Sequence, residues 1–250
     1  MSAYDAAFFA GQQAGSEVSA HAVIPLIREL VRFSSVADVG CGTGAWLKAF
    51  AQSGTSDYHG FDGRWALDAG LLIPADRFTP ADLAHPPSPP RRFDLALSLE
   101  VAEHLPEASA DAFIDFLTRL APVVVFSAAI PGQGGTDHLN EQWPDYWATR
   151  FTARGFVCVD ALRPRLWDDQ RVRWWYAQNT LVYVARDHLV EQPALTSLLK
   201  EHPALPSIPL SLVHPECYRR ARKPLSVRGL IKELPRAFGR AVARRFGRRP

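Results

Sequence analysis

Apolar runs and amphipathic segments alternate along most of the chain. The apolar runs predict buried strands at 35–39, 57–61, 77–81, 93–99, 122–130, 155–162 and 179–185. Apolar side chains at three- and four-residue intervals predict helices at 16–33, 44–53, 64–70 and 108–120, the first with Ser16 as its N-cap. This alternation predicts an α/β fold, in which one mostly parallel sheet of about seven strands has helices on both faces.

A glycine-rich turn follows the first predicted strand and is the most informative stretch of the chain. Residues 36–44 read VADVGCGTG, so that Asp38 is followed by Gly40, Gly42 and Gly44 at alternate positions. Glycine lets the backbone approach a nucleotide-like ligand where a Cβ atom would collide with it. A dinucleotide-binding turn has the spacing G-x-G-x-x-G. The shorter spacing here, with an acidic residue before the first glycine, resembles the first motif of class I S-adenosylmethionine (SAM) methyltransferases.

This resemblance implies a Rossmann-like fold whose last strand is antiparallel and lies beside the fifth. It also implies SAM as the cofactor and S-adenosylhomocysteine (SAH) as the product. Because SAM is a cation without phosphate, acidic groups are expected to line its site. The resemblance assigns Asp38 to the methionine end, and it assigns close backbone contact to Gly40, Cys41, Gly42 and Gly44, with Cys41 as a small side chain in the turn.

Acidic residues also stand at the ends of the next three predicted strands. Asp62 can accept both ribose hydroxyls in a bidentate hydrogen bond, although its position also suits a dinucleotide. The resemblance places Asp82 beside the adenine amine and Glu100, after the fourth strand, in the cofactor pocket. Each acid alone is more simply explained as solvated or as capping a helix. Together with the glycine turn, the three predict SAM binding.

Polar residues cluster in the segment 130–143, IPGQGGTDHLNEQW, after the predicted fifth strand. His138 is the predicted general base, because a neutral imidazole suits the proton of an attacking hydroxyl. Glu141 is predicted to orient that imidazole. The pair could instead hold a divalent ion, but two ligands do not make a site, and no metal is predicted. Three alternatives stay open: His138 bonds only to backbone, Asn140 caps the following helix, or His104 is the base.

Aromatic residues are concentrated nearby, and five of the seven tryptophans lie between positions 143 and 175. Aromatic faces suit the apolar side of a sugar ring, although most of these residues are expected in the core. Over 36–185 the chain resembles bacterial class I methyltransferases associated with cell-surface polysaccharide or secondary-metabolite glycan assembly. The resemblance implies transfer of a methyl group to a hydroxyl of a sugar or glycan-type acceptor. The predicted substrate-binding residues are Asn140, Gln142, Trp143, Trp175 and Gln178.

Three other functions stay open. The same fold could methylate an amine or another small metabolite, and an amine acceptor needs no base. A dinucleotide-dependent oxidoreductase is disfavoured by the glycine spacing. A non-catalytic SAM-binding or scaffold subunit would bind the cofactor without turnover.

Charge is unevenly distributed along the chain. Residues 219–250 carry twelve Lys and Arg and one acid, whereas residues 1–218 carry 16 basic and 25 acidic side chains. Apolar residues at helical spacing within this tail predict a basic amphipathic helix that lies on an anionic membrane surface. An equally weighted alternative is that the tail packs on the acidic body or stays disordered. Nucleic acid is not an expected partner, because no aromatic residues interleave for base stacking.

The predicted organisation is an N-terminal helical segment (1–33), a methyltransferase domain (34–186), a proline-rich extension (187–218) and the basic tail (219–250). The prolines of 85–92 predict that the helix usual before the fourth strand is missing or reduced. No apolar run approaches the ~20 residues of a membrane span, and the N-terminus does not resemble a secretory signal. Three widely spaced cysteines indicate neither disulfides nor a zinc site. A cytoplasmic location is therefore expected, with the tail as a route to the inner face of the membrane.

Overall fold

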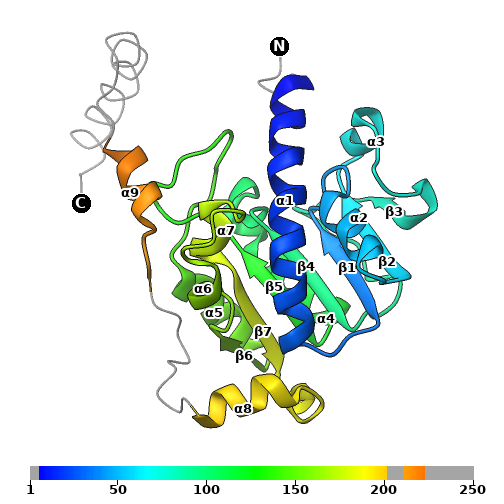
Figure 1. The fold of residues 1–250 in the computed structure, drawn as a ribbon. Helices are drawn as coiled ribbons and strands as arrows, with labels where there is room; N and C mark the ends of the chain where they lie inside the picture. Colours follow the sequence, from blue (N-terminus) through cyan, green and yellow to red (C-terminus); the bar gives the residue numbers. More distant parts are fainter. Residues whose placement is uncertain (1–5, 202–210, 223–250) are drawn as a thin grey trace, which may run out of the picture.

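The computed structural model describes residues 6–201 and 211–222. These residues form one seven-stranded sheet with the order β3-β2-β1-β4-β5-β7-β6 (Figure 1). The strands are β1 Ser35–Val39, β2 Asp57–Asp62, β3 Phe78–Pro80, β4 Leu95–Leu99, β5 Val123–Ser127, β6 Phe156–Val159 and β7 Leu181–Ala185. Neighbours from β3 to β5 are parallel, whereas β7 runs antiparallel to both β5 and β6. This confirms the predicted fold, including the antiparallel strand beside β5.

The three central strands, β1, β4 and β5, are buried over their whole length. Their sequences SVADV, LALSL and VVVFS have no continuous polar face, because helices cover both sides of the sheet. Asp38 is the one charged residue in these three strands, and it lies near the carboxyl end of β1. A charge in such a position is costly unless it serves a ligand or a partner.

Helices cover both faces of the sheet, as predicted. Figure 1 shows α1 crossing the near face along its length, with α4 behind the sheet. The near face carries α1 Ala6–Leu30, α2 Ala45–Gln52, α6 Arg163–Leu166 and α7 Trp174–Asn179, and the far face carries α4 Ala110–Leu120 and α5 Pro144–Ala153. The remaining helices are α3 Trp65–Ala69, α8 Pro193–Glu201 and α9 Pro215–Ala221, with short 3₁₀ turns η1 Ala75–Arg77, η2 Ala102–His104, η3 Glu107–Ser109 and η4 Arg186–Glu191. Each face thus has its own apolar core.

Two predicted helix boundaries were wrong near the cleft. The first helix begins at Ala6, so Ser16 lies inside α1 and is not its N-cap. The preceding residues are rich in Ala and Gln, which are good helix formers, and the helix continues through them. Trp143, not Asn140, is the N-cap residue of α5, because Pro144 occupies the first helical position. The helix-capping alternative for Asn140 is therefore also wrong.

The beginning of the last strand was also misplaced. Gln178 and Asn179 end α7, and β7 begins only at Leu181. The predicted fifth strand, 122–130, is shorter in the structure and ends at Ser127. In contrast, the described chain has no helix between β3 and β4, as the prolines of 85–92 predicted.

The connections between strands locate the cleft. From β1 the chain moves outward to β2 and β3 on one side, and then returns to β4 and β5 on the other. The strand order therefore reverses between β1 and β4, which are neighbours in the sheet. In open α/β sheets, ligands bind at such a reversal, outside the carboxyl ends of the strands.

Several predictions concern the ends of the chain. Most of the basic tail, residues 223–250, lies outside the described residues, as do 1–5 and 202–210. The predicted contact of the tail with a membrane surface therefore stays a prediction. None of the described helices is long and apolar enough to cross a membrane. The three cysteines are buried and unpaired, in agreement with the expected absence of a disulfide framework.

Candidate active site

A cleft of about 1190 Å³ opens where the strand order reverses. Its walls come from the glycine turn, the ends of β2 and β4, the turn after β3, η2, the loop 133–139, residues of α2, α3 and α7, and one residue each of α1 and α9. Among the described residues that line it are six acids, Asp38, Asp62, Asp82, Glu100, Glu103 and Asp137, and one basic Lys or Arg side chain, that of Arg220. This imbalance favours a cationic ligand.

Two glycines of the turn after β1 have positive φ angles, and they differ in what surrounds them. Gly40 has a φ of 83°, and a Cβ atom there would lie 2.2 Å from Cγ2 of Val101. A side chain at this position would therefore strain the backbone and collide with the segment after β4. Gly42 has a φ of 56°, and a Cβ there would meet only Trp65, at 3.9 Å. The space above Gly42 is thus open toward the cleft.

Seven of the eight predicted cofactor-binding residues line the cleft, and Gly44 does not. Gly44 is the N-cap of α2, where a Cβ would lie 3.0 Å from Ile73, so it packs behind the turn. Cys41 lines the cleft, and burial raises the pKa of its thiol well above the usual range. A protonated, buried thiol agrees with its predicted role as a small side chain.

Two neighbouring carboxylates close one end of the cleft. Asp38 is buried, and its Oδ2 atom makes no hydrogen bond. Burial and the nearby charge of Asp62 raise the pKa of Asp38 to about 8. Asp62 accepts hydrogen bonds from the backbone nitrogens of Gly42 at 2.7 Å and Gly63 at 2.6 Å. Burial raises the pKa of Asp62 as well, although these two donors offset part of that effect.

Asp82 lies at the rim of the cleft, in the turn after the edge strand β3. Its side chain is 67% exposed and accepts hydrogen bonds from the Ala84 nitrogen at 2.9 Å and His85 Nδ1 at 3.0 Å. The hydrogen bond from His85 lowers the pKa of Asp82. Asp82 is therefore an ionised, accessible acceptor on the side of the cleft that is farthest from β5 in the sheet.

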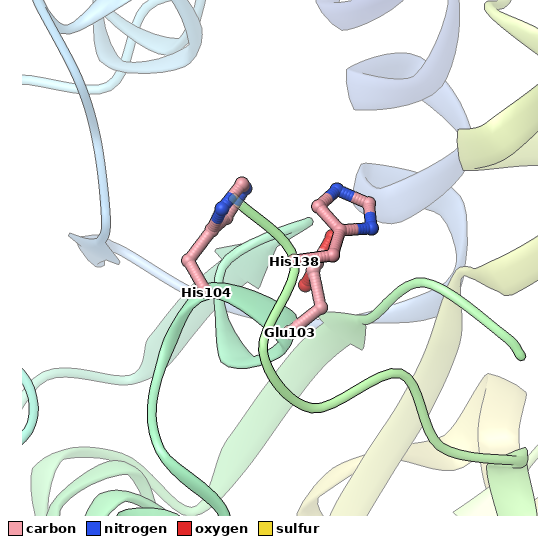
Figure 2. A group of neighbouring side chains, drawn as sticks. All are labelled: Glu103, His104 and His138. Carbon is pink, nitrogen blue, oxygen red and sulfur yellow. The ribbon is translucent and has the colours of Figure 1, made fainter. Parts of the chain in front are cut away.

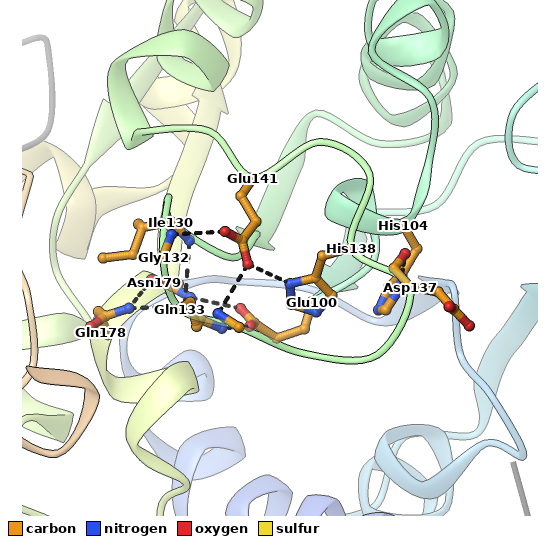
Figure 3. A network of polar contacts seen from close by, with 11 residues as sticks. Glu100, His104, Ile130, Gly132, Gln133, Asp137, His138, Glu141, Gln178 and Asn179 are labelled. Carbon is orange, nitrogen blue, oxygen red and sulfur yellow. Dashed lines mark hydrogen bonds and ion pairs between the residues drawn. The ribbon is translucent and has the colours of Figure 1, made fainter. Parts of the chain in front are cut away.

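Glu141 holds the loop that forms the opposite wall. Its carboxylate accepts hydrogen bonds from the backbone nitrogens of Gly132 at 2.8 Å and Gly134 at 3.0 Å, and it lies 2.8 Å from His138 Nδ1. His138 lines the cleft, whereas Glu141 lies behind it (Figure 3). The structure thus brings the two predicted catalytic residues into contact, in a loop and not on a helix, while their catalytic roles stay predictions.

A network of amide side chains surrounds Glu100 on the same side (Figure 3). Gln133 Nε2 donates to Glu100 Oε2 at 2.8 Å, and Asn179 Nδ2 donates to Oε1 at 3.0 Å. Gln178 Nε2 donates to Oε1 of Gln133 at 2.9 Å, while its own oxygen accepts from the His214 backbone nitrogen at 2.8 Å. Burial raises the pKa of Glu100, and these donors offset part of that effect. The network joins the turn after β4, the loop, α7 and the start of α9.

The predicted substrate-binding residues are dispersed. Trp175 lines the cleft, and Gln178 lies behind it in the network just described. Asn140 is buried and accepts a hydrogen bond from Gln142 at 2.8 Å, while Trp143 is 38% exposed; none of these three lines the cleft. The substrate roles of these residues stay predictions.

The sequence analysis gave no site role to several residues that line the cleft, among them Ser16, Trp65 and Glu103. Ser16 lines the cleft from α1, and its hydroxyl lies 3.1 Å from that of Tyr176. Trp65 lines it from α3 and is 43% exposed. Glu103 is fully buried beside His104 and His138. For Glu103 a signal was available, because it follows the buried fourth strand together with Glu100 and His104.

Comparison with families of known proteins decides the class of this site. A family model described as a methyltransferase domain matches residues 14–200. This chain belongs to that methyltransferase family. The dinucleotide-dependent oxidoreductase is therefore set aside.

Solved methyltransferase structures share the fold. Magnesium protoporphyrin IX methyltransferase from Synechocystis PCC 6803, crystallised with SAH, is 21% identical with a TM-score of 0.50, over 70% of this chain and 87% of that one. The methyltransferase in a complex with the Haloferax volcanii Trm112 methyltransferase activator is 17% identical with a TM-score of 0.52, over 74% of this chain and 99% of that one. No curated protein sequence matches this methyltransferase significantly.

The residues of the cleft fit SAM. The free Oδ2 of Asp38 offers an acceptor to a positively charged group, and the open space above Gly42 permits backbone approach. Asp62 accepts hydrogen bonds from two backbone nitrogens and from the Trp65 side chain, and its carboxylate keeps acceptor capacity for a ribose hydroxyl. Family and fold confirm the prediction of SAM as the cofactor, while the individual contacts stay predictions.

Proposed function

We propose that this methyltransferase transfers the methyl group of SAM to a hydroxyl of a sugar or glycan-type acceptor. The observation that carries the proposal is the 2.8 Å contact between His138 Nδ1 and Glu141 on the cleft wall. An ionised carboxylate only accepts hydrogen bonds, so in the neutral ring Nδ1 carries the proton. The hydrogen bond to Glu141 therefore leaves Nε2 as the ring nitrogen with the basic lone pair.

Different residues of the chain hold the cofactor and accept the proton. When bound, SAM supplies a methyl group on a positively charged sulfur, which leaves as a neutral thioether. Asp38, Gly42 and Asp62 hold and orient the cofactor from the β1–β2 side. An attacking hydroxyl loses its proton as the new C–O bond forms, and His138 accepts that proton at Nε2. Glu141 acts as a positioning residue, because it holds both the imidazole and the loop that carries it.

Aromatic side chains support an acceptor with a sugar ring. Trp174 and Trp175 are half-buried and line the cleft together with the loop 133–139, which carries His138. Exposed aromatic faces suit the apolar C–H side of a sugar, whose hydroxyls then meet the polar wall. An amine acceptor would not need His138, so the pair on the cleft wall favours a hydroxyl.

Methyl-labelled SAM tests the proposal in fractionated extract of the source cells. Wild-type protein is expected to place label in a glycan or lipid-linked glycan fraction. His138→Ala is expected to lower the rate ~100-fold or more while SAM affinity changes little, because only proton transfer is removed. Asp62→Ala is expected to lose SAM binding. The matched control is His188→Ala, which removes a histidine with the same i,i+3 pairing to a glutamate, Glu191, and does not line the cleft.

Two results would contradict the acceptor assignment. Label in an amine or protein fraction, with His138→Ala as active as the wild type, would indicate an N-methyltransferase. Absence of label in every fraction, despite measurable SAM binding, would indicate a non-catalytic SAM-binding subunit.

A further inference from the structure

Three side chains that commonly bind metals meet at one point of the cleft wall. Glu103 and His104 come from η2, and His138 comes from the loop after β5 (Figure 2). One potential ligand atom from each lies within 4.8 Å of the others. The backbone oxygen of Glu103 accepts hydrogen bonds from the nitrogens of Leu139 at 2.7 Å and Asn140 at 3.0 Å. The backbone itself therefore ties the two segments together and fixes the cluster.

The side chain of Glu103 points to a missing cation. It is fully buried, and no side chain donates a hydrogen bond to either carboxylate oxygen. An unpaired buried carboxylate is costly, and a bound cation would supply its missing partner. Among the described residues that line the cleft, Arg220 is the one Lys or Arg, and its guanidinium pairs with Glu216 at 2.8 Å.

Both imidazoles are arranged as metal-binding histidines usually are. His138 directs Nδ1 at the Glu141 carboxylate, 2.8 Å away, and His104 directs Nδ1 at the backbone oxygen of Asp137, 3.4 Å away. A metal-bound histidine typically donates its other ring nitrogen to a carboxylate or a backbone carbonyl. In both residues this leaves Nε2 as the nitrogen with a free lone pair.

We propose that Glu103, His104 and His138 bind one divalent transition-metal ion. Two imidazoles and one carboxylate suit Mn²⁺, Fe²⁺, Co²⁺ or Zn²⁺, whereas Mg²⁺ and Ca²⁺ prefer oxygen ligands. Three protein ligands leave a coordination position open for water or an acceptor oxygen. The sequence analysis predicted no metal, because it considered only the pair His138 and Glu141.

The metal and the proposed base use the same atom, Nε2 of His138. They are alternative states of the site, and Glu103→Gln separates them, since it removes one metal ligand and leaves the His138–Glu141 pair in place. Binding of the metal does not depend on the identity of the methyl acceptor. The result of a metal-binding experiment without SAM or acceptor is therefore independent of the result of the methyl-transfer assay.

Zn²⁺ titrated into the chelator-stripped full-length protein, followed by calorimetry, is the direct test. The wild type is expected to bind one equivalent. Glu103→Gln and His104→Ala are each expected to weaken binding ~10-fold or more, whereas His188→Ala binds as the wild type does. Equal Zn²⁺ binding by the wild type and both ligand variants would overturn the proposal. Tighter saturable binding of Mg²⁺ than of Zn²⁺ would overturn the assignment to transition metals.

Thermal unfolding provides a second readout that guards against misfolded variants. Zn²⁺ is expected to raise the Tm of the wild type and to leave that of Glu103→Gln unchanged. Equal stabilisation of the wild type and of Glu103→Gln by Zn²⁺ would count against the site.

Discussion

The cofactor side of the cleft is held by backbone hydrogen bonds between neighbouring strands, whereas the acceptor side depends in addition on side-chain hydrogen bonds between distant segments. On the cofactor side, the nitrogens of Gly40 and Cys41 donate to the Phe61 oxygen at 2.7 Å and 3.3 Å. On the acceptor side, Asn179 reaches Glu100 across 79 positions of the chain. The first arrangement follows from strand pairing, but the second exists only when α7, the turn after β4 and the loop have packed together.

This difference has consequences for mutation. A change in the glycine turn should disturb the fold and SAM binding together, because the same backbone atoms serve both. A change in the side-chain network should reduce turnover of the acceptor more than it weakens SAM binding, because Glu100 is the one predicted cofactor-binding residue in that network. Three predictions can break or sharpen this contrast.

The largest effect is expected from Gly40→Ala. The new Cβ would lie 2.2 Å from Val101, and the backbone φ of 83° is itself unfavourable for alanine. Left-handed strain and overpacking together should cost about 2–5 kcal/mol of unfolding free energy. Urea unfolding measures this cost, and calorimetry should show a concurrent loss of SAM affinity.

Gly54→Ala is the matched control for that variant. Gly54 has a similar φ of 96°, but a Cβ there meets nothing within 4 Å. It should lose only the strain contribution, about 1–2 kcal/mol, and should bind SAM normally. Equal destabilisation by the two substitutions would mean that the contact with Val101 contributes nothing to the loss of unfolding free energy in Gly40→Ala.

An intermediate effect is expected from Gln133→Ala. This change removes a donor to Glu100 and an acceptor from both Gln178 and Asn179, so buried polar groups lose partners at a cost of about 1–3 kcal/mol. Because the loop that carries His138 loses its anchor, kcat/KM should fall roughly 10- to 100-fold, by ~1.4 kcal/mol for each factor of ten.

The affinity of the Gln133→Ala variant for SAM should change little. Gln170→Ala serves as control, because Gln170 is exposed and donates only to the backbone oxygen of Asp168. If Gln133→Ala weakens SAM binding as strongly as it slows turnover, the two sides of the cleft are not separable.

Per pH unit, the smallest effect is expected from Asp38, through a pH dependence of stability. Its pKa is raised from 3.8 to about 8 in the folded protein without cofactor, so between these values the native state binds a proton that the unfolded state has lost. Stability should therefore decrease as pH rises through this range, with a slope approaching about 1.4 kcal/mol per pH unit from this residue. Urea unfolding of the cofactor-free protein at a series of pH values measures it.

Asp38→Asn should reduce that slope by the contribution of one proton. Asp62, whose pKa is also raised, contributes in the same direction, so the slope should not vanish. SAM affinity of the wild type should rise with pH across the same range, because a cationic ligand favours the ionised carboxylate. An unchanged slope in Asp38→Asn would show that this carboxyl is not the titrating group.

Local sequence patterns were sufficient for the cofactor side. The positive φ angles of the glycine turn and the strand-end positions of Asp38 and Asp62 depend on residues that are close in the chain. The pairing of His138 with Glu141 was also within reach, because three-residue spacing brings side chains together in many turns. Such short-range geometry needs little more than the backbone conformation of a few residues.

The environment of Glu103 and the partners of Glu100 were not predictable in this way. Gln133 and Asn179 meet Glu100 only because β4, β5 and β7 lie side by side, and the sequence analysis placed Asn179 in a strand. His104 and His138 meet Glu103 only because the loop after β5 folds back onto η2.

By itself, the sequence determined the fold class and the glycine turn, because periodicity and backbone conformation are local properties. Its resemblance to class I methyltransferases gave the cofactor. The tertiary structure alone decided which carboxylates are buried without side-chain partners and which amides hold the loop that carries His138. It also decided that α1 contributes Ser16 to the cleft. The physical reason is that burial and side-chain partners depend on contacts between segments far apart in the chain. No local pattern encodes those contacts, since they form only when the helices close over the sheet.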